Sequence, residues 1–168
     1  VYHMLLGKAK EKGLAFNVDS DKNLPAKLYG DEVRIRQILV NILNNAIKYT
    51  EKGSVTLNVG MSEQQNADAI NNNNVTGSQP AKNIIITFTI SDTGIGIKSE
   101  NISHLFDSFS RFDENKNKHI EGTGLGLAIT KQLTKLMNGK INVTSKYGEG
   151  SVFEVSIPQK VVSDLKIG

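Results

Sequence analysis

Hydrophobic and polar positions follow two different periods along the chain, and each period predicts a type of element. Alternating apolar and polar residues are typical of strands, whereas apolar residues that recur every three or four positions are typical of helices. Alternation predicts strands at residues 14–18, 55–59, 141–145 and 151–157, and a nearly continuous apolar run predicts another at 84–91. The helical period predicts helices at residues 2–12, 31–49, 99–106 and 124–137.

Some properties of these elements can also be predicted. The strand at 14–18 is expected at the edge of a sheet, followed by a turn at 19–25. The strand at 84–91 reads IIITFTIS, which is β-branched and nearly continuous, so we expect burial on both faces. Asn138-Gly139 should end the fourth helix, and Pro158 should end the last strand.

The order of the elements neither alternates strictly nor separates strands from helices. It favours an α/β fold, a two-layer sandwich with a mixed, mostly antiparallel sheet of about five strands and about three helices on one face. We expect residues 1–12 to be the remnant of a preceding helix and residues 13–160 to form one domain. Residues 161–168 are expected to be a C-terminal tail.

Two polar stretches interrupt the pattern. Residues 61–82 include the asparagine run 71–74 and have no apolar period. We expect a disordered, Asn-rich insertion that lengthens a hairpin connection at little cost in stability. Residues 107–123 are polar and end in a glycine-containing sequence, which is typical of a mobile flap.

Composition narrows the class of protein. The 168 residues carry a formal net charge of +3 without a block of like charges, so we expect no nucleic-acid partner. The absence of cysteine excludes a disulfide scaffold, a thiolate zinc site and a cysteine nucleophile. No apolar run approaches the roughly 20 residues that cross a bilayer, and no signal peptide opens the chain. The chain begins at Val1 rather than Met, so we expect a fragment of a longer protein.

One face of the helix at 31–49 carries amides where a solvated face would carry Glu and Lys. At 100° per residue, an arc of about 80° contains Arg34, Gln37, Asn41, Asn45 and Lys48. Asparagine is a poor helix former. Two side-chain carbonyls one turn apart suit a hard cation such as magnesium, which also takes phosphate oxygens. The alternative is a pair of buried asparagines that neighbouring backbone groups satisfy.

A second candidate site follows the most apolar strand, in the sequence Asp92-Thr-Gly94-Ile-Gly96-Ile97. The glycines permit close approach of a ligand, and the carboxylate can accept a hydrogen bond from a ring amino group. A structural turn is one alternative, because Asp and Gly dominate turns. An aspartic protease is another, because an apolar strand followed by Asp-Thr-Gly is its signature and two such aspartates share a proton.

A third candidate site, Gly122-Thr-Gly124-Leu125-Gly126-Leu127, is expected to open the last helix. Backbone N–H groups and the helix dipole at such a terminus suit a phosphate group. The spacing matches neither the dinucleotide-binding motif nor the P-loop, and a flexible hinge is the alternative. The preceding stretch supplies cations for the same phosphates, namely Arg111, Lys116, Lys118 and His119.

In this order and spacing, the motifs together resemble the ATP-binding catalytic domain of sensor histidine kinases. That domain has the Bergerat-type fold, which gyrase, MutL-type and Hsp90-type ATPases share. The resemblance extends from Leu14 to Pro158. It rests on an asparagine box at 41–50, a first glycine box at 92–97, a phenylalanine box at 106–109, a second glycine box at 122–127 and a closing segment at 148–153.

The resemblance implies that the ligands are ATP and Mg²⁺. Asn45 would ligate magnesium with help from Asn41, and Lys48 would reach the phosphates. Asp92 would accept the adenine amino group, helped by a water bound to Ser151.

Further nucleotide contacts follow from the same resemblance. The adenine ring would lie between Tyr49 and Ile97, and residues 107–123 would be the ATP lid with Arg111 and Lys116 as its cations. The nucleotide would also contact the two glycine boxes through Gly94, Gly96, Gly122, Gly124, Leu125 and Gly126.

Asn41 stands where the ATPase relatives carry a Glu that activates water. An amide cannot accept a proton, so hydrolysis should be poor and another nucleophile is expected. The resemblance implies transfer of the γ-phosphoryl group to a histidine on a separate dimerisation and phosphoacceptor hairpin. His3, His104 and His119 all lack the sequence context of that acceptor.

The resemblance also implies partners and a location. The partners would be the phosphoacceptor hairpin and a response-regulator receiver domain, in a parent protein that is a homodimer. The domain is expected to be cytoplasmic, and the fragment leaves open whether its parent is anchored to a membrane. A regulatory module of the same fold that binds nucleotide without transferring phosphate is the alternative.

Overall fold

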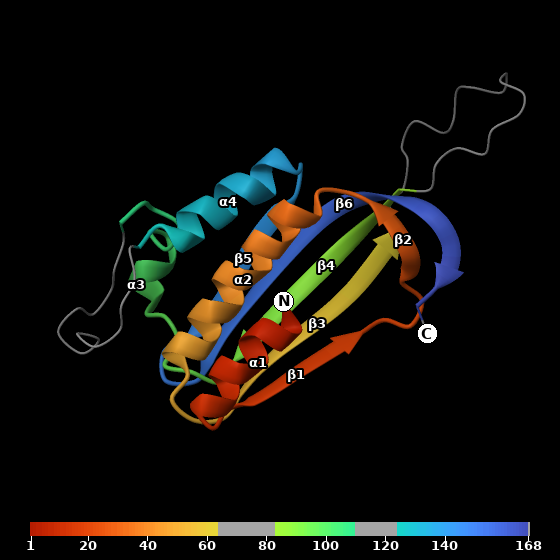
Figure 1. Cartoon of the computed structure of the whole chain (residues 1–168). Helices are drawn as coiled ribbons and strands as arrows, with labels where there is room; N and C mark the ends of the chain where they lie inside the picture. Colours follow the sequence, from red (N-terminus) through yellow and green to blue (C-terminus); the bar gives the residue numbers. More distant parts are fainter. Residues whose placement is uncertain (64–82, 110–123, 168) are drawn as a thin grey trace, which may run out of the picture.

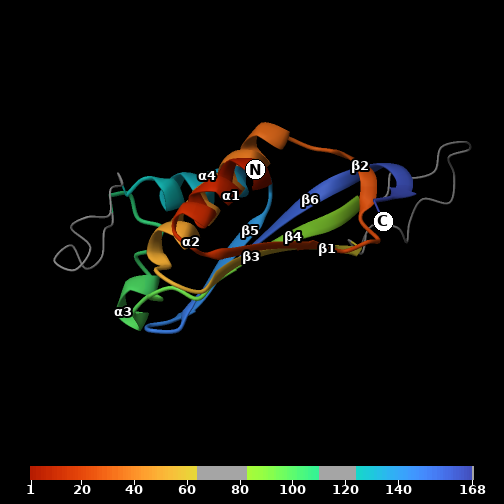
Figure 2. The same ribbon diagram turned by 60° about the horizontal axis from the view of Figure 1, so that its bottom comes forward.

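The part of the chain that the structure describes, residues 1–63, 83–109 and 124–167 of a computed structural model, forms two layers. One face of a β-sheet is covered by the helices α1 (Tyr2–Glu11), α2 (Glu32–Tyr49) and α4 (Gly126–Leu136), as Figures 1 and 2 show. The short helix α3 (Ser99–Ile102) lies at one end of the sheet. The predicted α/β sandwich with helices on one face is therefore confirmed.

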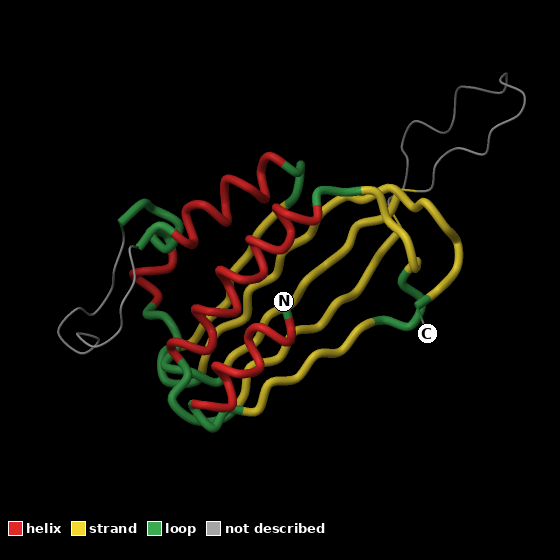
Figure 3. Tube along the Cα trace, viewed as in Figure 1, coloured by secondary structure: helices red, strands yellow, loops and turns green. Residues whose placement is uncertain are grey.

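Within the described ranges the sheet has six strands, drawn in yellow in Figure 3. They are β1 (Ala15–Ser20), β2 (Pro25–Tyr29), β3 (Ser54–Glu63), β4 (Asn83–Asp92), β5 (Lys140–Lys146) and β6 (Gly150–Lys166). Their spatial order is β1-β3-β4-β6-β2, and β5 also pairs with β6. Only the β1–β3 pair is parallel among the described strands, which confirms a mixed, mostly antiparallel sheet. β1 lies at an edge, as predicted, and the strand that the sequence did not predict is β2.

β4 corrects one expectation about burial. Its buried residues alternate along the strand and point toward the helices: Ile84, Ile86, Phe88 and Ile90. The residues between them are only half-buried, so the prediction of burial on both faces was wrong. The helices cover a single face of the sheet, and Thr87 and Thr89 on the other face tolerate partial exposure.

β6 corrects a second expectation, because the strand continues through Pro158 to Lys166. β5 pairs with β6 up to Ser156, and β2 pairs with it from Lys160 onward. Pro158 lies between these two partners, at a place where its missing N–H group costs little. Residues 161–166, which we expected in a C-terminal tail, therefore form the end of this strand.

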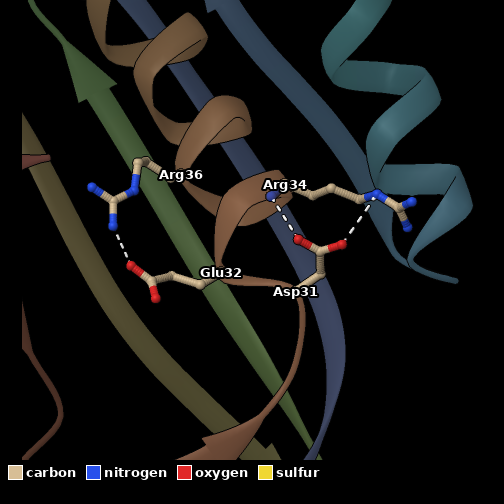
Figure 4. Close-up of polar contacts among 4 residues, drawn as sticks. All are labelled: Asp31, Glu32, Arg34 and Arg36. Atoms are coloured by element: carbon tan, nitrogen blue, oxygen red, sulfur yellow. Dashed lines mark hydrogen bonds and ion pairs between the residues drawn. The ribbon is translucent and has the colours of Figure 1, made fainter.

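The helix α2 begins as its sequence predicts. The Asp31 carboxylate caps it, with Oδ1 accepting from the Arg34 backbone N–H at 3.0 Å and Oδ2 lying 3.2 Å from Arg34 Nε (Figure 4). Glu32 pairs with Arg36 one turn further on. An N-terminal carboxylate satisfies free N–H groups and favours the helix dipole, so these contacts fix the first turn of α2.

The core lies between the helices and the covered face of the sheet. α2 contributes the fully buried Ile38, Ile42 and Leu43, and the strands contribute Val55, Ile84, Ile90, Val155 and Ile157. The helix α4 ends next to Asn138, whose φ is 55°, and Gly139, as predicted. In the described residues, no helix is long and apolar enough to span a membrane.

Candidate nucleotide-binding site

The C-terminal end of α2 meets the first glycine box. The Ile95 N–H donates to the Tyr49 carbonyl at 3.1 Å. A Cβ atom on Gly94 would lie 2.4 Å from that carbonyl oxygen and 2.9 Å from both Thr50 Oγ1 and Asp92 Oδ1. Only glycine fits at this position, so the packing of the turn against α2 is itself a reason for Gly94.

Asp92 is the last residue of β4 and lies between Val55 of β3 and Ser151 of β6 in the register of the sheet. Its Oδ1 accepts from the Gly94 N–H at 2.9 Å. Burial raises the pKa of the Asp92 carboxyl above its ordinary value, although hydrogen bonds from the backbone of Gly94 and Ser151 act in the opposite direction. A partly buried acceptor at a strand end suits recognition of a polar ring edge.

Ser151 is buried and forms part of a hydroxyl network. Ser145 Oγ donates to the Gly150 carbonyl at 2.8 Å, accepts from the Ile97 N–H at 2.8 Å and lies 3.0 Å from Ser151 Oγ. A hydroxyl has one proton, so Ser151 is the donor in the serine pair. The Ser151 hydroxyl can then still accept a hydrogen bond from a water through its lone pairs. The predicted water that would link Ser151 to adenine stays a prediction.

Sequence reasoning missed Ser145. Its hydroxyl ties the backbone of Ile97 in the first glycine box to the turn between β5 and β6. A signal was present, because Ile141, Val143 and Ser145 alternate with exposed residues along β5. A serine that continues such an apolar series has to find hydrogen-bond partners.

The remaining glycine of this box also has a steric reason. Gly96 has a φ of 66°, and a Cβ atom there would lie 2.1 Å from the Lys146 carbonyl oxygen. Gly150, the first residue of β6, has a φ of 118°, and a Cβ atom there would lie 2.0 Å from the Asp92 carbonyl oxygen. These contacts pack the first glycine box against the β5–β6 turn, so nucleotide contact by Gly96 remains a prediction.

Asn41 and Asn45 lie on the same side of α2 but differ in their contacts. Asn41 Nδ2 donates to the Gly126 carbonyl at 3.1 Å and to Thr130 Oγ1 at 3.4 Å. For Asn41, this supports the alternative of an asparagine that neighbouring groups satisfy. Asn45 is half-buried, and its amide forms no hydrogen bond with another residue that the structure describes.

Lys48 and Tyr49 are the last two residues of α2, next to the first glycine box. Lys48 Nζ lies 4.9 Å from the centroid of the Tyr49 ring, at cation–π distance. Both side chains are half-buried. Ile97 is also half-buried, and its side chain packs against the core. The contacts of Tyr49 and Ile97 with an adenine ring stay predictions.

The second glycine box lies beside α2. Gly126 is the first residue of α4, Leu125 is its N-cap, and Gly124 has a φ of 71°. The Gly124 carbonyl accepts from the Phe109 N–H at 3.2 Å, which brings residues 109 and 124 together. The predicted opening of a helix by this box is confirmed, while Gly122, Arg111, Lys116, Lys118 and His119 lie outside the described residues.

The donor set limits how a magnesium ion would be held. In the described ranges, no group of three or more His, Cys, Asp or Glu side chains could hold a metal. The Asn45 amide oxygen suits a hard cation but is a single ligand. The Asn45 amide therefore fits a magnesium ion for which phosphate and water supply most of the oxygen ligands.

Comparisons with known proteins agree with this arrangement. Residues 30–161 match the family described as histidine kinase-, DNA gyrase B-, and HSP90-like ATPases. Hybrid signal transduction histidine kinase B of Dictyostelium discoideum is 39% identical over 148 residues, which is 88% of this chain and 7% of that protein. The aerobic respiration control sensor protein ArcB of Escherichia coli is 34% identical over 158 residues, which is 94% of this chain and 18% of that protein.

Solved structures give the same assignment. Full-length ShkA in complex with AMPPNP superposes with a TM-score of 0.73 at 29% identity, over 97% of this chain and 29% of that chain. The catalytic domain of the histidine kinase ThkA superposes with a TM-score of 0.64 over 94% of this chain and 88% of that chain. Its 24% identity supports the fold alone.

The family match excludes the aspartic protease alternative. The chain spans only a small part of the curated relatives, 7% and 18% of the two named. It belongs to the family of histidine kinase-, DNA gyrase B- and HSP90-like ATPases, as a catalytic ATP-binding domain of the sensor histidine kinase type.

Proposed function

We propose that this domain binds Mg·ATP and transfers the γ-phosphoryl group to a histidine on a separate phosphoacceptor hairpin. The observation that carries the proposal is the position of Asn41, which faces the second glycine box with an amide instead of a carboxylate. An amide can hold the box in place, but it cannot take a proton from water. This favours a nucleophile from another domain over hydrolysis.

Each proposed role follows from the chemistry of a side chain. Asp92 accepts a hydrogen bond from the adenine amino group, and Asn45 offers its amide oxygen to the metal. Lys48 places a positive charge at the end of α2, where it can attract the phosphates. Asn45 would hold a magnesium ion there, and the charge of that ion would offset the negative charge on the oxygens of the transferred group. Arg111 and Lys116 would add cations from the expected lid.

The transfer step needs no base from this domain. A ring nitrogen of a neutral histidine carries a lone pair and attacks the γ-phosphorus directly. The bond from that phosphorus to the bridging oxygen of ADP breaks as the phosphorus–nitrogen bond forms, ADP leaves with the bonding electrons, and the proton on the other ring nitrogen passes to water. The domain contributes the position of the nucleotide and the charges around it, which is most of what phosphoryl transfer requires.

The proposed partners follow from the same step. The acceptor hairpin belongs to the parent protein, which we propose to be a homodimer, and a receiver domain takes the phosphoryl group next. The names of relatives such as a hybrid signal transduction histidine kinase support this arrangement. We expect no nucleic-acid partner, because the net charge of +3 comes without a block of like charges.

Labelled ATP tests the proposal. The domain is incubated with magnesium, ATP labelled at the γ-phosphate and a separately made phosphoacceptor hairpin. We expect acid-labile label on the hairpin, much less label with Asn45→Ala, and wild-type label with Asn142→Ala, which removes an exposed amide from β5. ATP binding without any transfer would favour the regulatory module.

A further inference from the structure

The last four carbonyl groups of α2 lack donors within the helix, as at the end of any α-helix. Two of them are satisfied close to the site. The Ala46 carbonyl accepts from Thr50 Oγ1 at 2.7 Å, and the Tyr49 carbonyl accepts from the Ile95 N–H at 3.1 Å. The end of α2 is therefore fastened by its own capping residue and by the first glycine box.

The other two carbonyls are satisfied by a residue from a different helix. Lys12 Nζ donates to the Ile47 carbonyl at 2.7 Å and to the Lys48 carbonyl at 3.0 Å. It also donates to the Thr50 carbonyl, just beyond the helix, at 2.9 Å. An ammonium group has three protons, so each carbonyl can receive one. A positive charge at a helix C-terminus is favoured by the helix dipole as well.

The backbone around Lys12 is held by the way α1 ends. Gly13 has a φ of 68°, its N–H donates to the Lys10 carbonyl at 2.9 Å, and the Leu14 N–H donates to the Ala9 carbonyl at 2.9 Å. This pair of bonds is the Schellman arrangement, with Ala9 and Leu14 buried as its apolar contact. The side chain of Lys12 therefore starts from a defined position.

α1 has further contacts that hold it against α2. Leu5 and Ala9 are fully buried in the core. Lys8, one turn before Lys12, donates to Asn44 Oδ1 at 3.0 Å. In Figure 1, α1 and α2 run to the same end of the sheet. A movement of α1 relative to the sheet would therefore pull on the end of α2.

We propose that Lys12 is a positioning residue for the nucleotide site, which couples α1 to the end of α2 that carries Asn45, Lys48 and Tyr49. The proposal rests on the proposed function, because it assumes that nucleotide binds at this end of α2. Lys12 touches no nucleotide itself. It acts through the Ile47, Lys48 and Thr50 carbonyls, and its loss leaves them without their charged donor.

The test compares two lysines that lie two residues apart. Lys12→Met removes the ammonium group and keeps an aliphatic side chain, whereas Lys10→Met removes the same charge from an exposed position in the same helix. Calorimetry measures the dissociation constant of ADP with magnesium at 25 °C, after unfolding curves establish that each variant is folded. Amide hydrogen exchange of Ile95 reports on the end of α2.

We expect Lys12→Met to weaken ADP binding by roughly 3- to 10-fold, on the scale of one ordinary hydrogen bond, because Lys12 acts on the nucleotide only through the end of α2. The Ile95 amide should exchange faster, while Lys10→Met should match the wild type. Lys12→Arg should restore most of the binding, because a guanidinium keeps the charge and several donors. A merely structural lysine would lower stability without changing the affinity of the folded domain.

Two results would overturn the coupling. One is wild-type affinity in folded Lys12→Met, and the other is equal weakening by Lys10→Met, which would reveal a general charge effect. Should Lys12→Met fail to fold, Lys12→Gln is judged by the same two criteria, because its shorter side chain loses the charge and one of the three N–H donors while it stays polar. Failure of the wild-type domain to bind ADP would instead contradict the proposed function.

Discussion

The side chain of Asn41 is hydrogen-bonded to the backbone carbonyl of Gly126 at 3.1 Å, across 85 positions of sequence. Asn41 belongs to the asparagine box on α2, and Gly126 opens α4 from the second glycine box. Thr130 Oγ1 donates to the same carbonyl at 2.9 Å. The bond therefore fixes where the N-terminus of α4 lies relative to α2.

Replacing Asn41 by Ala should loosen this connection. We expect the free energy of unfolding to fall by about 1 kcal/mol, because the Gly126 carbonyl keeps its bond from Thr130 and is not left unpaired. ATP binding should weaken as well, since the N-terminus of α4 is free to shift. Urea unfolding and calorimetry measure the two effects. Asn142→Ala is the control and should change stability by less than about 0.5 kcal/mol; an equal effect of both variants would contradict the role of Asn41.

The raised pKa of Asp92 predicts how stability depends on pH. A carboxyl whose pKa is higher in the folded state contributes stability below its ordinary pKa of 3.8 and loses that contribution as the pH rises through the folded-state value. Asp92→Asn has no charge to bury. We therefore expect its unfolding free energy, relative to wild type, to increase between pH 3 and pH 7 in urea titrations. A decrease over that range would mean that the hydrogen bonds from Gly94 and Ser151 outweigh burial.

The same substitution should have the opposite effect on function. At pH 7, Asp92→Asn should weaken ADP binding by roughly 1.5–3 kcal/mol, the scale of a hydrogen bond to a charged acceptor. Wild-type affinity should fall on acidification as Asp92 is protonated, and the variant should show a smaller pH dependence. Calorimetry across that pH range checks both statements. Equal pH profiles, or equal affinity of the wild type for ADP and GDP, would argue against the adenine contact.

Ser145→Ala should destabilise the first glycine box. Ser145 Oγ is hydrogen-bonded to the Ile97 N–H, the Gly150 carbonyl and the Ser151 hydroxyl, and the substitution removes this partner from all three. We expect a loss of roughly 1–3 kcal/mol in unfolding free energy, because unpaired buried polar groups are costly. Thr144→Val removes a hydroxyl from the adjacent, exposed position and should be nearly neutral. Similar losses in both variants would mean that the network is not what stabilises the turn.

The sequence predicted the elements that rely on local signals. α2 has an apolar period and an N-terminal Asp31, and α4 is followed by Asn138 and Gly139, so both helices were found with their ends. β2 was missed because its residues, PAKLY, show no clear alternation and begin with proline. That strand forms only because the distant end of β6 pairs with it, and such pairing has no local signal.

The candidate site shows the same difference between local signals and contacts that join distant residues. The boxes themselves were readable from residue types and spacing, and their resemblance to the kinase domain placed them in one site. The contacts that hold them together were not readable, because they join residues far apart in the chain. Lys12 reaches carbonyls 35 or more positions away, and Ser145 bonds to Ile97 across 48 positions.

The partition of the γ-phosphate between histidine and water is the most direct measurement of the central claim. The wild-type domain, magnesium and γ-labelled ATP are incubated with the phosphoacceptor hairpin, and label on histidine and free phosphate are followed in the same reaction. Because Asn41 offers no base, and a positioned base is typically worth ~10²–10⁴ in rate, we predict that transfer to the hairpin greatly exceeds hydrolysis. Rapid release of free phosphate with no label on histidine would contradict the account and place the domain with the ATPases of its family.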